Sequence, residues 1–198
     1  MTLANLQELF ARVARIIGAL EEKAGPGTSW DYTFPDGSTT TYEISNVKTP
    51  EELQDQFASL AVWTWAIKDY LKALAPNLGT TPQAIEDYAS QDRALPLCAD
   101  LANLLKHGAL KSSRSGHWPA AVKPSYVVKH DPKAAATPIK SILFTPGGVK
   151  LDVADPAFVE IRFEVKSTCG AFLGDGLELV SAAIASWEAL YERLRYAV

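Results

Sequence analysis

Three polar residues that could carry acid–base chemistry lie on one predicted helix near the middle of the chain. Asp100, Asn103 and His107 stand at positions i, i+3 and i+7, which places them in one row beside the apolar stripe of a helix. An imidazole exchanges protons near neutral pH, and a carboxylate or amide one turn away can fix its tautomer. We therefore predict that Asp100, Asn103 and His107 are candidate catalytic residues.

A basic segment begins at the end of this helix. From Lys106 to Lys140 there are seven lysines and arginines and a single acid, Asp131, which gives this segment a charge of +6 in a chain whose net charge is −4. Lysine and arginine neutralise phosphates, serine hydroxyls add hydrogen bonds, and a tryptophan stacks on a base for ~1–3 kcal/mol. The candidate nucleic-acid-binding residues are Lys106, Lys111, Arg114, His117 and Trp118.

Both features also have simpler explanations. Lys106 and His107 suit the last turn of a helix, because a cation interacts favourably with the negative end of the helix dipole by ~0.3–1 kcal/mol. The segment 111–118 is also typical of a solvated surface loop whose tryptophan packs back on the helices. The histidines at 107, 117 and 130 are spaced ten and thirteen residues apart, which is not the periodicity of metal ligands, so no metal or other cofactor is predicted.

Periodicity identifies the elements that must position these residues. Apolar residues at three- and four-residue spacing predict helices over about 3–20, 49–73, 82–90, 95–107 and 173–194. Alternating aromatic and polar residues predict a β-hairpin around the turn Pro35–Ser38. Further short strands are predicted at about 126–128, 139–145, 149–153 and 159–165, and the turn at 146–148 joins the second and third of these as another hairpin.

These elements indicate an α+β fold: a helical bundle of about five helices with an inserted β-hairpin and a small antiparallel sheet. A chain of 198 residues fits one domain. We predict a single domain over 1–198, with a helical core at about 1–24, 49–108 and 170–197. The β elaboration is expected at about 29–45 and 122–166.

Composition and cysteine usage indicate the compartment. Hydrophobic residues make up 47% of the chain and charged residues 21%, as in ordinary folded proteins. Cys98 and Cys169 form no Cys-x-x-Cys pair, so both are predicted to be buried thiols in a reducing compartment. The first residues do not resemble a signal peptide, and the apolar run 57–67 is too short to cross a bilayer. We expect a cytoplasmic protein without a membrane partner.

Residues from about 50 to 120 resemble a group of bacterial proteins with a HEPN-like helical core. The resemblance is carried by Asp-Leu-Ala-Asn-Leu-Leu-Lys-His at 100–107, between a tryptophan-rich helix and a basic Ser/Arg loop. In the HEPN family the motif is an arginine, often followed directly by a polar residue, then a histidine after four to six intervening residues. Asn103 and His107 match the polar and histidine positions, whereas Ala102, Leu101 and Asp100 stand where the family has its arginine.

The resemblance implies RNA or other single-stranded nucleic acid as a partner, a homodimer, and a role in bacterial defence. Cleavage of RNA through its 2′-hydroxyl needs an acid or base, which His107 supplies, and a cation facing the phosphorane, which Ala102 cannot supply. We therefore predict nucleic-acid binding through 106–140 with little or no catalysis. Two alternatives are a non-catalytic homo-oligomeric scaffold that binds a protein partner, and a metal-independent ribonuclease that uses His107.

Overall fold

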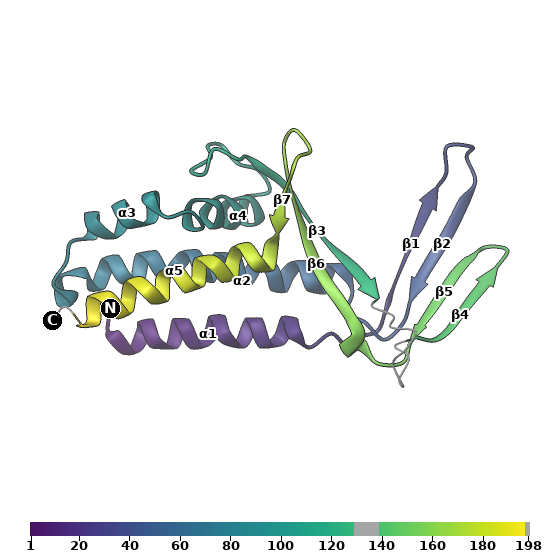
Figure 1. Cartoon of the computed structure of the whole chain (residues 1–198), viewed down its shortest axis with the longest axis horizontal. Coiled ribbons are helices and arrows are strands. Elements are labelled where there is room, and N and C mark those ends of the chain that lie inside the picture. Colours follow the sequence, from purple (N-terminus) through teal and green to yellow (C-terminus); the bar gives the residue numbers. More distant parts are fainter. Residues whose placement is uncertain (129–138, 197–198) are drawn as a thin grey trace.

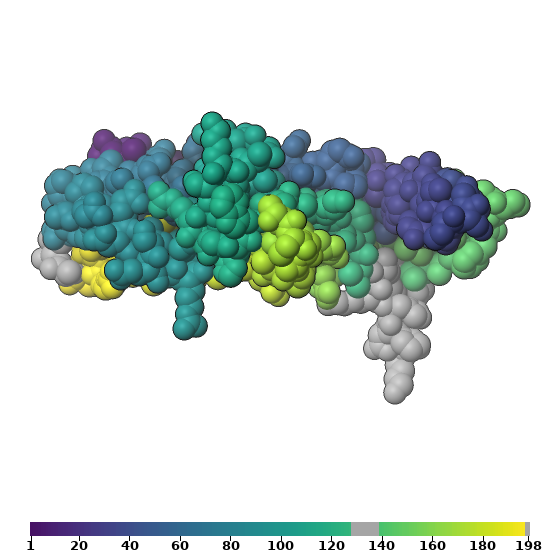
Figure 2. Space-filling model, turned by 90° about the horizontal axis from the view of Figure 1, so that it is seen from above, coloured from purple at the N-terminus to yellow at the C-terminus, as the bar shows by residue number. Residues whose placement is uncertain are grey.

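The apolar stripes of the sequence come together as a bundle of helices with two small sheets attached (Figure 1). This computed structural model describes residues 1–128 and 139–196, and it confirms the predicted α+β class. The helices lie side by side at one end of the molecule, and a four-stranded sheet extends from the other end (Figures 1 and 2). The candidate site lies on the bundle, at the end of one helix.

The helices begin and end close to the predicted limits. They are α1 (Leu3–Glu21), α2 (Pro50–Leu74), α3 (Pro82–Gln91), α4 (Leu95–His107) and α5 (Gly176–Tyr196), with short 3-10 turns at Ala75–Leu78 and Pro156–Phe158. Threonine side chains cap the first three: Thr2, Thr49 and Thr81 each accept a hydrogen bond from a backbone N–H of the first turn. These bonds satisfy donors that the start of a helix would otherwise leave unpaired.

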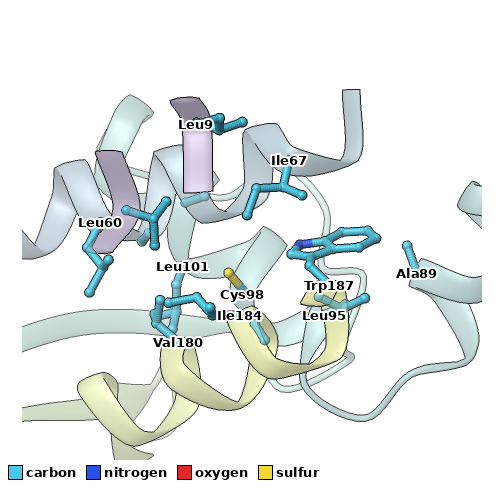
Figure 3. Close-up of a cluster of buried hydrophobic side chains, with 14 of the residues drawn as sticks. Leu9, Leu60, Ile67, Ala89, Leu95, Cys98, Leu101, Val180, Ile184 and Trp187 are labelled. Carbon is cyan, nitrogen blue, oxygen red and sulfur yellow. The ribbon is translucent and has the colours of Figure 1, made fainter. Parts of the chain in front are cut away.

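Helix α2 is the centre of the bundle and contacts each of the other four helices. Its apolar residues point to several sides and pack against all of these neighbours, and two of them, Leu60 and Ile67, are completely buried. Trp187 of α5 is also fully buried, and Figure 3 shows it beside Ile67, with Leu95 of α4 and Ala89 of α3 around it. One continuous apolar core therefore joins all five helices among the described residues.

The first sheet is an antiparallel ribbon that lies against the bundle. Its strands β3 (Pro119–Val128), β6 (Val159–Ser167) and β7 (Phe172–Asp175) pair in the order β3-β6-β7. Phe163 of β6 stacks on Phe57 of α2 with ring centroids 4.5 Å apart, and both side chains are fully buried. Because β7 occupies 172–175, helix α5 begins at Gly176, later than the limit predicted from its apolar spacing.

The second sheet combines two hairpins that are distant in the sequence. Strands β1 (Thr28–Thr33), β2 (Thr39–Ile44), β4 (Ile139–Thr145) and β5 (Gly148–Val153) pair in the order β1-β2-β5-β4. Both hairpins are antiparallel, as predicted, but β2 and β5 pair in parallel. The sheet is therefore mixed and not purely antiparallel, because local alternation specifies a strand but not its distant neighbour.

A buried lysine joins the bundle to the three-stranded sheet. Lys48 is 4% exposed, and its ammonium donates to the carbonyl of Ala19 at 2.5 Å and to Oε1 of Gln56 at 3.2 Å. The backbone carbonyl of Lys48 accepts a 2.6 Å hydrogen bond from Tyr126 Oη on β3. Burial, with Glu51 and Glu52 nearby, raises the pKa of Tyr126 to about 12, so this hydroxyl is a donor at neutral pH.

The two cysteines have different environments. Cys98 is fully buried, and burial raises the pKa of its thiol to about 12. Cys169 is exposed, so its predicted burial is wrong: it lies in the turn between β6 and β7, where the strand alternation has ended. None of the helices in the described part of the chain is long and apolar enough to cross a membrane.

We predict that Gly176→Ala destabilises the fold. A Cβ at this position would lie 2.6 Å from Cζ of Phe57 and 3.0 Å from Cβ of Phe163, inside a core pair that has no room to move. Such overpacking costs about 1–3 kcal/mol, measurable by urea denaturation. Gly18→Ala is the matched control, since nothing lies within 4 Å of its added methyl and alanine favours a helix by up to about 1 kcal/mol. Equal effects of the two substitutions would contradict the packing argument.

Candidate functional site

Asp100 is completely buried, and its carboxylate organises the loop that follows α4. Its Oδ2 accepts hydrogen bonds from the hydroxyls of Ser113 and Ser115, both at 2.6 Å, and from the backbone N–H of Ser115 at 3.0 Å. Its Oδ1 accepts the backbone N–H of Arg114 at 2.7 Å. Burying a carboxylate is costly unless hydrogen bonds replace its water, and here four donors from the loop do so.

These hydrogen bonds give Asp100 a structural role, whereas the sequence predicted that it orients the His107 imidazole. Both carboxylate oxygens are directed to the loop, and His107 lies seven residues further along α4, roughly 10 Å up the helix axis. The two serines extend the network, because Ser113 accepts the N–H of Gly116 at 2.9 Å and Ser115 accepts that of His117 at 3.1 Å. Asp100 is therefore a residue that positions the basic loop.

Asn103 and His107, by contrast, lie together at the end of α4. They line a surface cleft of about 470 Å³ with Ala109, Leu110, Lys111 and Ser112. Gly108, with φ of 74°, ends the helix and turns the chain so that the loop borders this cleft. Two polar groups of the predicted catalytic row thus share one cleft with a lysine from the predicted binding loop.

The lysines around this helix end form no ion pairs with carboxylates in the described structure. Within the described residues, no ion pair involves Lys106, Lys111 or Lys123, and all three side chains are exposed. Lys123 of β3 lies opposite Glu164 of β6, but the Glu164 carboxylate is held by Lys166 at 3.2 Å. Lys123 also lines a neighbouring depression of about 350 Å³ beside Leu105 and Gly108. The unpaired lysines of the candidate site therefore come from three elements: α4, the loop that follows it, and β3.

Arg114 belongs to a different cluster, on the side of the loop that faces the bundle. Its guanidinium lies 3.5 Å from Glu86 of α3 and over the ring of Trp65, 5.2 Å from its centroid. The same carboxylate is held by Lys72 at 2.7 Å and by Lys68, 8% exposed, at 3.1 Å. Three cations therefore converge on one carboxylate, and Arg114 is committed to holding the loop against α2 and α3.

Sequence reasoning missed this cluster, although a signal was present. Lys68 and Lys72 stand four residues apart on a helix that is otherwise apolar nearly all round, and buried lysines need partners. Burial raises the pKa of Glu86, but hydrogen bonds from Lys72 and Lys68 outweigh this and hold it at about 2, below its ordinary 4.5. The carboxylate is thus charged at every pH at which the protein is normally handled.

The remaining predicted binding residues lie at the end of the loop. His117 is exposed, and the Trp118 side chain is 42% exposed. Trp118 adopts a φ of 49°, which is uncommon for a residue other than glycine, and its carbonyl accepts the N–H of Thr168 at 2.9 Å. The backbone of Trp118 is fixed to the β6–β7 turn, while much of its ring stays open to a ligand.

The predicted basic segment extends beyond the described residues. Lys129, His130, Asp131 and Lys133 lie outside the described residues. Among the described residues, no three His, Cys, Asp or Glu side chains come close enough together to hold a metal ion. The site as described therefore consists of Asn103, His107 and the cations around the end of α4.

Comparisons with models of protein families, with curated proteins and with solved structures found no match. The resemblance to the HEPN family remains a prediction that rests on residues 100–107.

We predict that Asp100→Asn destabilises the protein and loosens its loop. The amide keeps the size of the side chain but has one acceptor oxygen and directs N–H groups at the loop donors. Losing buried, charge-assisted hydrogen bonds costs about 2–4 kcal/mol, measurable by urea denaturation. Amide hydrogen exchange at Arg114 and Ser115 should accelerate at the same time.

Asp36→Asn is the matched control for this substitution. Asp36 also accepts hydrogen bonds from the backbone and hydroxyl of one serine, Ser38, but it does so in an exposed turn. Its replacement should leave the denaturation midpoint nearly unchanged. An Asp100 variant as stable as the control would contradict the anchoring role.

We predict that Glu86→Gln removes a pH-dependent contribution to stability. Because the folded-state pKa of Glu86, about 2, lies below its ordinary 4.5, the ion pairs stabilise the fold above about pH 4.5. This contribution, on the order of 1–3 kcal/mol once solvent screening of a partly exposed group is included, is lost as the pH falls toward 2. The stability difference between parent and variant, measured by denaturation from pH 7 to pH 3, should therefore shrink below pH 4.5. A stability difference that stays constant with pH would contradict this prediction. Asp87→Asn is the control, because Asp87 is a neighbouring acid without an ion pair in the described structure, and a comparable loss of stability in this variant would also contradict the prediction.

Proposed function

We propose that this chain binds single-stranded RNA, or a similar single-stranded nucleic acid, at the end of α4 without cleaving it. The observation that carries the proposal is a set of unpaired lysines near the end of α4: Lys111 lines the cleft, Lys123 lines the neighbouring depression, and Lys106 lies in the last turn of the helix. Lys106, Lys111 and Lys123 have no carboxylate within ion-pair distance in the described structure, although the chain as a whole is acidic. Unpaired lysines gathered on one surface of an acidic protein favour a polyanionic ligand.

The neighbouring groups suit the parts of a nucleotide. The three lysines can neutralise phosphates, while Asn103 and Ser112 in the cleft can hydrogen-bond to phosphate or sugar oxygens. The half-exposed ring of Trp118 offers a surface on which a base can stack. This pattern provides contacts to backbone and base faces and no fixed set of base-edge contacts, so we expect binding with little sequence preference.

The arrangement favours binding over catalysis. A cleaving site needs His107 oriented by a partner and a cation facing the reacting phosphate. Asp100 directs both oxygens to the loop, and Arg114 is held by Glu86. Two of the groups that catalysis would recruit are therefore engaged in holding the structure together.

Salt dependence tests the proposal. Affinity for a fluorescein-labelled single-stranded RNA, measured by anisotropy, should fall with salt with a logarithmic slope of about −2 if three lysines contact phosphates. The combined substitution of Lys106, Lys111 and Lys123 by alanine should weaken binding on the order of 10-fold or more and bring the slope toward zero. Arg114→Ala should change the slope far less, because its charge is already paired.

Lys150→Ala is the control, since Lys150 lies on the four-stranded sheet and pairs with Glu43 at 2.7 Å. It removes one positive charge without touching the site, so binding should persist. Absent or salt-insensitive binding, or an equal loss in the control, would contradict the proposal. Degradation of the RNA by the parent but not by His107→Ala would replace it with the ribonuclease alternative.

A further inference from the structure

The four-stranded sheet has one face made entirely of uncharged, mostly apolar side chains. Trp30 of β1 lies opposite Tyr42 of β2, and Tyr42 lies opposite Val149 of β5. Phe144 of β4 completes this row opposite Val149. Residues paired across strands share a face, and alternate residues along a strand share it too. We call this the apolar face; its members on the outer part of the sheet are Trp30, Tyr32, Tyr42, Ile142, Phe144 and Val149.

The inner end of the apolar face is covered by the rest of the molecule. Ile44 and Val153 are buried with Val47 and Val159 in a second core, against which Tyr126 of β3 packs. The face therefore continues outward from an existing core. Beyond that core the sheet extends away from the helices (Figure 1), and nothing in the described structure covers it.

The outer part of the face is strongly exposed. The exposed fraction is 79% for Phe144, 52% for Tyr32, 48% for Trp30 and 46% for Ile142. Trp30 stacks on Tyr42 with ring centroids 5.7 Å apart, so the rings form one surface and not separate protrusions. An apolar surface of this kind marks an interaction site.

The opposite face of the same sheet is polar and satisfied. Thr41 donates to Asp31 at 2.7 Å, and Lys150 pairs with Glu43 at 2.7 Å. Lys140 pairs with Asp152 at 3.4 Å. Both lysines of these four strands are thus paired with carboxylates and Asp31 is hydrogen-bonded, and none of these charges lies in the rows of the apolar face.

We propose that a second copy of this chain covers the apolar face, so that two sheets pack face to face in a symmetric dimer. The exposed parts of Trp30, Tyr32, Ile142, Phe144 and the adjoining Phe34 amount to roughly 500 Å², taking ~200 Å² for a whole large apolar side chain. A stable interface buries about 800 Å² on each partner around an apolar centre. Two sheets about 10 Å apart, as in a β-sandwich, bury such faces against each other.

The absence of charge on the apolar face favours a second copy of the chain as its binding partner. An isologous dimer places the same surface on both sides, so any charge near its centre would meet its own copy. The apolar face meets that condition, whereas a nucleic acid or an anionic membrane would find no cation on it. The dimer does not depend on the proposed nucleic-acid binding, which uses the other end of β3 and α4.

Charge placed on the two faces of one strand tests the dimer. The full chain at about 100 µM, measured by light scattering after size exclusion, should be a dimer, because even a dissociation constant of ~10 µM would assemble it there. Phe144→Asp should weaken dimerisation on the order of 100-fold, since it would bury an unpaired carboxylate. Leu143→Asp is the control: Leu143 is 55% exposed on the same strand but lies opposite Lys150, on the polar face, so its variant should remain a dimer.

A second substitution guards against misfolding. Tyr32→Asp lies on the same face but on the other hairpin, and it too should give a monomer with a cooperative unfolding transition. A monomeric parent at 100 µM would overturn the inference. So would a dimer that survives both apolar-face substitutions, or one that is lost equally in Leu143→Asp.

Discussion

The buried carboxylate of Asp100 is the constraint on which the candidate site depends. A charge withdrawn from water must be satisfied by donors, and these donors come from the backbone and hydroxyls of residues 113–115. That fixes the loop in one conformation, which directs Arg114 toward Glu86 and leaves Lys111 beside His107. This interaction therefore decides which cation of the loop faces the protein and which faces solvent.

This sorting explains why a count of charges is a poor guide to a binding surface. Lys48, Lys68 and Arg114 add to the positive charge of the chain, yet each is engaged by protein carbonyls or carboxylates. Lys106, Lys111 and Lys123 make the same contribution to net charge and have no such partner in the described structure. Only the unpaired group can exchange its counterions for phosphates, which is the source of electrostatic affinity.

Local patterns in the sequence were sufficient for most of the fold. The threonine caps, the apolar spacing of α1, α2 and α4, and both hairpins were predictable, because each depends on residues close together in the chain. The partners of Asp100 were not, since the same helical spacing that aligns it with His107 says nothing of a loop thirteen to fifteen residues ahead. Glu86 and the β2–β5 pairing likewise depend on contacts between distant elements. Cys169 was misplaced because a turn interrupts the alternation that surrounds it.

The parallel pairing of β2 with β5 also sets an order of assembly. Each hairpin can close by itself from adjacent residues, but β2 ends at Ile44 and β5 begins at Gly148, with most of the helical bundle between them. Contacts between residues so distant in sequence form slowly, because a long loop must first be closed. The two hairpins are therefore expected to join after the bundle has collapsed. Until then, the unpaired edges of β2 and β5 and the aromatic residues of the two hairpins stay open, and the nascent chain is most prone to aggregation at this stage.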